Sequence, residues 1–179
     1  TGVLTTDCSA DGTCIATACQ QGFVSCDSGC CDFIVATVAD APAPATAGSW
    51  PSLAVGYDGV AHVAFYRSVL GSGEIVHAMG SVDGFAETLI GSSGYQSFGR
   101  YPRMDIDLLG TPRVGFRGGP TAGMGEIAVA SYEGGLWVTE TLADSFGVYG
   151  YDGKDFDLAT DGVSPAVAYS AASQTVISK

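Results

Sequence analysis

Two stretches of this chain repeat each other at an offset of 51 residues, and this internal repeat restricts the possible folds more than any other feature. PSLAVGYDGVAHVAFY (51–66) aligns without a gap with PRMDIDLLGTPRVGFR (102–117). GEIVHAMG (73–80) likewise matches GEIAVASY (125–132), and a third copy begins at Phe156 with FDLATDGVSPAVAYS. Self-similarity at such a period indicates an array of similar supersecondary units.

Each unit contains four short runs in which apolar and polar residues alternate. In the first unit these runs are 52–56, 61–66, 74–80 and 85–90, separated by Asp-Gly or glycine-rich turns. Alternation with a period of two between such turns predicts antiparallel strands. The 26 glycines, together with many β-branched and aromatic residues, favour an all-β chain with tight turns.

Four-stranded meanders that repeat every ~40–50 residues are typical of β-propeller blades. We therefore expect an all-β fold, a β-propeller of four-stranded antiparallel blades, with about three blade-equivalents in this chain. The expected blades span 50–91, 101–143 and 156–179, the last of them incomplete. Closed propellers have roughly four to eight blades, and open blades leave exposed sheet edges. A second chain or a second copy is thus expected to close the ring, unless the chain is a fragment of a longer protein.

A cluster of cysteines occupies the first 31 residues, and none follows it. Its members are Cys8, Cys14, Cys19, Cys26, Cys30 and Cys31. An even, clustered set indicates disulfides and an oxidising compartment, so we expect a secreted protein, extracellular or periplasmic. Zinc is the alternative, but Cys26-x₃-Cys30 is the only spacing like a zinc knuckle, and both histidines lie far away. The pairing stays open, because six cysteines allow 15 connectivities.

The cysteine-rich segment 1–40 also joins the repeat pattern, and the blades proper are expected in 41–179. CDFIVATVAD (31–40) resembles GLWVTETLAD (135–144), so 33–39 is expected to be the fourth strand of a blade. GTCIATAC (12–19) resembles GEIAVASY and is expected to be a third strand. Residues 20–31 would then form an enlarged loop stapled by disulfides. A separate cysteine-rich module is the alternative.

The charge balance excludes several classes of partner. The net charge is −12, from 19 acidic and 7 basic residues. Nucleic acid is an unsuitable partner, because phosphate contacts need a basic face, and an anionic membrane surface is disfavoured for the same reason. No stretch approaches the ~18 consecutive apolar residues of a membrane span. The acidic surface either keeps the protein soluble or binds Ca²⁺.

The pattern P-x-L-A-V-x-x-D-G-x-x-H-V-A-F-Y, followed by G-E-I-x-x-A, resembles the repeats of secreted bacterial β-propellers. Those include sugar-binding propeller lectins and propeller polysaccharide lyases. The resemblance covers roughly residues 50–179 and, weakly, 12–40. It is specific for the fold and nonspecific for function. The sialidase-type Asp-box, S-x-D-x-G-x-T-W, is not present, which weakens a sialidase assignment.

The loops between expected strands carry the candidate binding residues. In a propeller, connections from the fourth to the first strand share one face with those from the second to the third strand. Here these are 41–50, 91–101 and 144–156, with 67–73 and 117–125. Candidate ligand-binding residues on or beside them are Trp50, Arg67, Tyr95, Arg100, Tyr101, Arg103, Arg117, Tyr149 and Tyr151. Aromatic faces stack on sugar rings, and arginine forks bind carboxylate or sulfate. The alternative is that the aromatics cap blade cores and the arginines pair with acidic residues.

Carboxylates and histidines provide further candidates. Asp105 and Asp107 are expected on a first strand, where a period of two puts both on one face, able to bind Ca²⁺ or to act as a carboxylate pair. Asp157 is aligned with Asp105 in the third unit. His62 beside a tyrosine would supply the base and acid of a lyase, whereas a structural role for His62 and His77 is the alternative.

The first functional hypothesis is an extracellular binding module that recognises glycans or surface polymers through aromatic and arginine loops on one propeller face. The second is a polysaccharide lyase or glycoside hydrolase with its site at the channel mouth. The third is a structural subunit that completes a larger propeller assembly. No catalytic residue is assigned, because the sequence shows no convincing acid–base pair, and the balance favours a protein that is not an enzyme.

Overall fold

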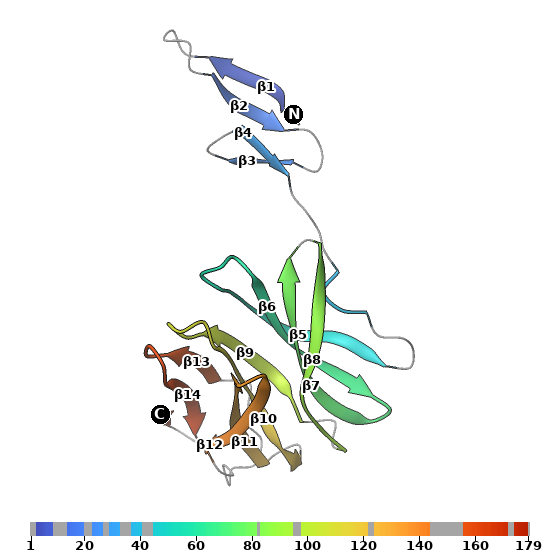
Figure 1. Cartoon of the computed structure of the whole chain (residues 1–179), viewed down its shortest axis with the longest axis vertical. Helices are drawn as coiled ribbons and strands as arrows, with labels where there is room; N and C mark the ends of the chain where they lie inside the picture. The colour runs from blue at the N-terminus through green and yellow to red at the C-terminus, as the bar shows by residue number, and fades with distance from the viewer. Residues whose placement is uncertain are drawn as a thin grey trace. The chain divides into compact units, whose positions relative to one another are not determined.

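The computed structural model describes residues 3–8, 14–19, 23–26, 29–32, 37–40, 45–81, 83–94, 98–121, 124–143, 156–171 and 174–178. These residues form antiparallel sheets and no helix, so the all-β prediction is confirmed (Figure 1). Within the described ranges, no helix is long and apolar enough to cross a membrane. The chain divides into two compact units, Thr1–Ala36 and Thr37–Lys179, which are described separately.

The first unit consists of two hairpins. β1 (Val3–Cys8) pairs with β2 (Cys14–Cys19), and β3 (Phe23–Cys26) pairs with β4 (Gly29–Asp32). The expected strand over 12–19 contains β2, but most of the expected loop over 20–31 is a hairpin. Sequence resemblance to blade strands did not reveal β1 or this hairpin.

Residues 33–39 were expected to form a fourth strand. Residues 37–40 have no regular secondary structure, and 33–36 lie outside the described residues. Nevertheless Val38 and Ala39 pack against one face of the first large sheet. The segment therefore lies where a strand of a neighbouring sheet would lie, without strand pairing among its described residues.

The second unit contains three antiparallel meanders in chain order. Sheet 1 has the order β5-β6-β7-β8, sheet 2 the order β9-β10-β11-β12 and sheet 3 the order β13-β14-β15. Their bounds are β5 Thr46–Val55, β6 Ala61–Val69, β7 Ser72–Ser81, β8 Gly84–Ser93, β9 Arg100–Ile106, β10 Pro112–Thr121, β11 Met124–Glu133, β12 Leu136–Ala143, β13 Phe156–Thr160, β14 Pro165–Ala171 and β15 Gln174–Ser178. The described strands form no closed ring.

Two hairpins are longer than their sequence pattern predicted. β6 and β7 run to within two residues of each other, and Leu70 and Gly71 in the turn both have positive φ angles. β10 and β11 likewise extend through most of the expected loop over 117–125. Backbone pairing continues beyond the alternating apolar residues, because a hairpin ladder needs no buried face to form hydrogen bonds.

The sheets stack face to face, and sheet 2 is covered on both faces. One apolar cluster joins Ala64, Ile75 and Ile90 of sheet 1 to Met104, Val114, Phe116, Ala128 and Ala130 of sheet 2. A second cluster joins Ile127 and Val129 of sheet 2 to Phe156, Leu158 and Val167 of sheet 3. Alternating side chains of one strand thus enter two different cores, which is the consequence of the period-two pattern.

The same repeat positions form both interfaces. Val114 packs toward sheet 1, and Val167 at the matching position packs toward sheet 2. At Gly115 the fit to the following sheet is close, because a Cβ there would come within 3.1 Å of a ring carbon of Phe156. The repeat therefore specifies a directional stack, in which the position of Val114 and Val167 faces the preceding sheet.

Candidate functional site

A repeated Gly-x-aromatic-Pro segment opens the first strands of sheets 1 and 2. Gly48 and Gly99 have φ angles of +80° and +79°, and Trp50 and Tyr101 have φ angles of +50° and +54°. The pairing register shifts at both places, between Ser49 and Ser52 and between Gly115 and Arg117. Positive φ is uncommon for bulky side chains, and such residues cluster at functional positions.

This backbone brings the rings of Trp50, Tyr66 and Tyr101 together. The Trp50 ring lies 5.3 Å from the Tyr66 ring and 4.6 Å from the Tyr101 ring, tilted by 53° and 51°. The guanidinium of Arg100 lies 5.6 Å from the centre of the Trp50 ring and 6.0 Å from that of Tyr66. Both ranges are typical of favourable aromatic and cation–π contacts.

Within this aromatic–arginine cluster, exposure differs sharply between members. Trp50 is 39% exposed, whereas Tyr66 is 5% exposed. Tyr101 and Arg100 are half-buried, and Tyr101 also packs against the core between sheets 2 and 3. The cluster therefore has a rigid buried base and one large ring open to solvent, an arrangement suited to stacking on a flat apolar ligand face.

The structure brings together three of the predicted binding residues, Trp50, Arg100 and Tyr101, and places others elsewhere. Arg67 lies on β6 and not in a loop, and its side chain bonds Glu74 and Glu87, each at 2.8 Å. Burial alone would lower the pKa of Arg67, but these two carboxylates raise it above its ordinary value. Arg67 thus follows the alternative interpretation, in which arginines pair with acidic residues.

Arg103 and Arg117 also lie on strands. The guanidinium of Arg103 lies 5.6 Å from the Phe156 ring and 3.9 Å from the Asp157 carboxylate, at the interface of sheets 2 and 3. Arg117 on β10 is 2% exposed, so its side chain is not offered to a ligand at the surface. Tyr95, Tyr149 and Tyr151 lie outside the described residues.

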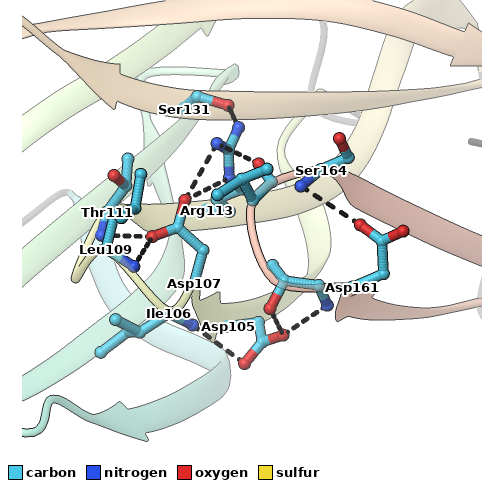
Figure 2. Close-up of polar contacts among 11 residues, drawn as sticks. Asp105, Ile106, Asp107, Leu109, Thr111, Arg113, Ser131, Asp161 and Ser164 are labelled. Atoms are coloured by element: carbon cyan, nitrogen blue, oxygen red, sulfur yellow. Dashed lines mark hydrogen bonds and ion pairs between the residues drawn. The ribbon is translucent and has the colours of Figure 1, made fainter.

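Asp105 and Asp107, the candidate Ca²⁺ ligands, point to different partners (Figure 2). The buried Asp107 carboxylate forms an ion pair with the Arg113 guanidinium at 3.0 Å and accepts hydrogen bonds from the backbone amides of Leu109 and Thr111. Burial alone would raise the pKa of Asp107, but these hydrogen bonds and the Arg113 charge hold it below its ordinary value. Asp107 follows the end of β9, and its contacts close the turn into β10.

Asp105 connects sheet 2 to sheet 3. Its Oδ2 atom accepts hydrogen bonds from the Thr160 amide at 2.7 Å and the Thr160 hydroxyl at 2.9 Å. Asp157, which the sequence aligned with Asp105, is paired with Ala168 and takes the repeat position of Arg103, so that alignment was wrong by two residues. No group of three or more potential metal ligands occurs among the described residues.

The two histidines form a buried pair on the face of sheet 1 that contacts sheet 2. His62 Nδ1 lies 3.0 Å from His77 Nε2, and His77 Nδ1 lies 3.3 Å from the Thr88 hydroxyl, which also accepts the Trp137 indole N–H. Burial, and then the neighbouring His62, lower the pKa of His77 to about 4. Burial lowers the pKa of His62 too, although Asp58 opposes the shift.

This pair favours the structural interpretation of the histidines. His62 and His77 are 7% and 3% exposed, so neither ring is open to a polymer. A neutral imidazole has one donor and one acceptor nitrogen, which is what this chain of hydrogen bonds requires. His62 does border a shallow depression of about 220 Å³ between the turns at 56–58 and 108–110.

Sequence reasoning missed Tyr66, Thr88 and Trp137. Tyr66 could have been predicted from the hairpin register. When Leu53 pairs with Val63, Tyr66 comes opposite Ser49, the residue before Trp50. Thr88 and Trp137 belong to different sheets and meet only through sheet packing, for which a single sequence gives no register. No protein-family model matches the chain, and the search of curated proteins found no relative.

Proposed function

We propose that the chain is an extracellular binding module built from β-propeller blades, and that it recognises glycans through the aromatic–arginine cluster of Trp50, Tyr66, Arg100 and Tyr101. The observation that carries this proposal is the half-exposed Trp50 ring, held on Tyr66 and Tyr101 and flanked by Arg100. The propeller assignment is supported by the directional stacking of four-stranded meanders, sheet 2 being buried on both faces.

A rigid aromatic platform suits a sugar because the C–H face of a pyranose ring is apolar and flat. The Trp50 ring packs on two tyrosine rings, which restricts the positions it can take, and its backbone has a φ of +50° before a proline. Preorganisation of this kind reduces the entropy lost on binding. The cost of the unusual backbone, about 1–3 kcal/mol for each such residue, is consistent with a functional position.

Arg100 is the residue from which we infer the chemical class of the ligand. An arginine presents several N–H donors in a fixed plane and binds carboxylate or sulfate more strongly than neutral hydroxyls. Because the protein carries a net charge of −12, a polyanion is repelled at long range. The favoured ligand is therefore a pyranose segment that bears a single carboxylate or sulfate at the Arg100 position, within an otherwise sparsely charged glycan.

The test is calorimetric titration, with tryptophan fluorescence, of a short glucuronic-acid-containing oligosaccharide and its neutral analogue. We expect Trp50→Ala to abolish binding of both oligosaccharides and Trp50→Phe to retain part of the binding. Arg100→Gln is expected to weaken the affinity for the acidic oligosaccharide only, by roughly tenfold. Tyr57→Ala is the matched control, because Tyr57 is an aromatic residue 80% exposed beyond the opposite end of β5. Binding that survives Trp50→Ala, or no binding of either sugar, would rule out the cluster as a glycan site.

The extracellular location rests on the cysteines. Register places Cys8 opposite Cys14 in the β1–β2 hairpin, and Cα atoms of directly opposed residues lie about 4.5–5.5 Å apart, within the range of a disulfide. Non-reducing peptide mapping of protein exported from the cell is expected to find no free thiol. Six alkylatable thiols in freshly exported protein would contradict this part of the proposal.

A further inference from the structure

One face of sheet 1 is built to be covered by another sheet of the same repeat. On this face Leu53 and Val55 of β5 are 62% and 60% exposed, and Leu89 of β8 is 50% exposed. Exposed apolar residues that gather on one face of a sheet mark an interaction surface. This face is opposite the one that sheet 2 covers, because Leu53 and Ala54 alternate and Ala54 packs against the core between sheets 1 and 2.

The repeat shows what belongs on this face. Leu53, Met104 and Leu158 occupy the same repeat position, and each is paired with the valine of the following strand: Val63, Val114 and Val167. Met104 and Leu158 are each 8% exposed, since sheet 1 covers the first and sheet 2 the second. Leu53 is 62% exposed, because no sheet among the described residues of the second unit covers it as sheet 1 covers Met104.

One short segment, 37–40, already lies on this face of sheet 1. Val38 and Ala39 pack on Val63, Phe65, Val76 and Ala78 of sheet 1. They belong to the sequence TVAD (37–40), which matches TLAD (141–144), and Leu142 of the latter packs into the core between sheets 2 and 3. Val38 thus packs on sheet 1 in the way that Leu142, on the fourth strand of sheet 2, packs at the interface with sheet 3. What remains uncovered is the area that the first strands of a preceding sheet would occupy.

We infer that a second copy of this chain supplies those strands, by placing its sheet 3 on sheet 1 in a head-to-tail contact. Sheet 3 has three strands among the described residues, β13, β14 and β15, and residues 37–40 of the first copy lie where its fourth strand belongs. The face of sheet 3 that would make the contact presents the exposed Ala159 and Asp157. Ala159 takes the repeat position of Ala54 of sheet 1, which packs against the core between sheets 1 and 2.

A hydrogen bond at the existing interface indicates the register. Ser52 Oγ accepts the Met104 amide at 2.9 Å, which ties sheet 1 to the first strand of sheet 2. Asp157 takes the repeat position of Ser52, and the Leu53 amide takes that of Met104. Asp157 Oδ1 lies near Arg103 and accepts a hydrogen bond from the Leu158 amide, so in the head-to-tail contact it is the Asp157 Oδ2 atom of one copy that accepts a hydrogen bond from the Leu53 amide of the other. The contact is heterologous, and two copies joined at both ends contain six sheets, within the range of a closed propeller.

Light scattering coupled to size exclusion tests the inference over a range of protein concentrations. The wild-type chain is expected at two chain masses. Leu53→Glu and Ala159→Glu, each altering one of the two faces, are expected to be monomeric, with the contact weakened at least about 100-fold. An equimolar mixture of the two variants is expected to regain two chain masses, because it retains one pair of intact faces.

The control is Leu70→Glu, at the 83% exposed tip of the β6–β7 turn, which is expected to leave the mass unchanged. Circular dichroism checks that each variant keeps its β structure, and Val55→Glu replaces Leu53→Glu if the latter does not fold. A wild-type chain that stays monomeric at every concentration overturns the inference. So does a mixture that stays monomeric, or an Ala159→Glu variant that still forms dimers, since both would exclude a head-to-tail contact. None of these outcomes depends on glycan binding.

Discussion

Acidification should destabilise the second unit through the buried histidine pair. In the folded protein the pKa of His77 is about 4, against an ordinary value of 6.5. Between these two pH values the unfolded chain binds more protons than the folded one, so stability rises with pH across this window. The contribution of a neutral His77 is complete above pH 6.5 and is lost as the pH falls toward 4. His62, whose pKa is also lowered, acts in the same direction.

The magnitude follows from linkage. For a single site with these two pKa values, lowering the pH from about 7 to about 5 removes about 2 kcal/mol of unfolding free energy. The structural reason is first burial, because a protonated His77 is a charge removed from water, and then the neighbouring His62, since two N–H donors would face each other across the 3.0 Å contact if both rings were protonated. A charge would also be buried beside the Trp137 ring, 5.1 Å from His77.

Urea unfolding followed by tryptophan fluorescence at several pH values measures this effect. Asp58 is the carboxylate that acts on His62, and both proteins retain it, so the difference between wild type and His77→Gln isolates the His77 imidazole. Glutamine keeps a donor and an acceptor but has no proton to gain. We expect the wild type to lose about 2 kcal/mol more than His77→Gln between about pH 7 and 5. Equal losses in the two proteins would refute the reasoning.

Two further predictions concern the backbone and the ion pairs. Gly99→Ala should destabilise the protein by at least ~2 kcal/mol more than Gly110→Ala in the same urea assay. Both residues have φ near +80°, but only at Gly99 would a Cβ lie 3.0 Å from the backbone of Glu74 and Ile75. Equal losses of unfolding free energy in the two variants would show that backbone strain alone matters. Asp107→Ala should lower the unfolding free energy by roughly 3–5 kcal/mol, because it leaves the Arg113 side chain, which is only 12% exposed, without its carboxylate partner. Glu74→Ala, beside the more accessible Arg67, should lower it by at most about 1 kcal/mol. A smaller loss for Asp107→Ala than for Glu74→Ala would contradict this ranking.

The sequence predicted the strands well where hydrophobic alternation and turn residues agree. The hairpin from β5 to β6 turns at Asp58 and Gly59, where Gly59 has a φ of +80° and the Asp58 carboxylate accepts the Val60 amide. Such signals are local, so a single sequence contains them. The pattern failed in the first unit, where β1 and the β3–β4 hairpin lack the alternation of the repeat.

Candidate site residues were harder to predict, because residue type does not tell where a side chain points. Arg67 and Arg117 looked equivalent to Arg100 as loop arginines. One is held by two glutamates, the second is buried, and the third lies against Trp50. Asp105 and Asp107 were expected on one face, but the strand ends between them and their carboxylates turn to Thr160 and Arg113.

By itself, the sequence determined the all-β class, the repeat and the strand order. Alternation and turn residues act over a few neighbouring positions, and the same unit occurs more than once along the chain. Only the tertiary structure decided that His62 and His77 form a buried pair, that Trp50 keeps an open ring, and that Leu53 is exposed where Met104 and Leu158 are covered. Those properties depend on which sheet lies against which. The repeat specifies the chemistry of each face, but the number of neighbours that a face receives is settled only when the sheets pack.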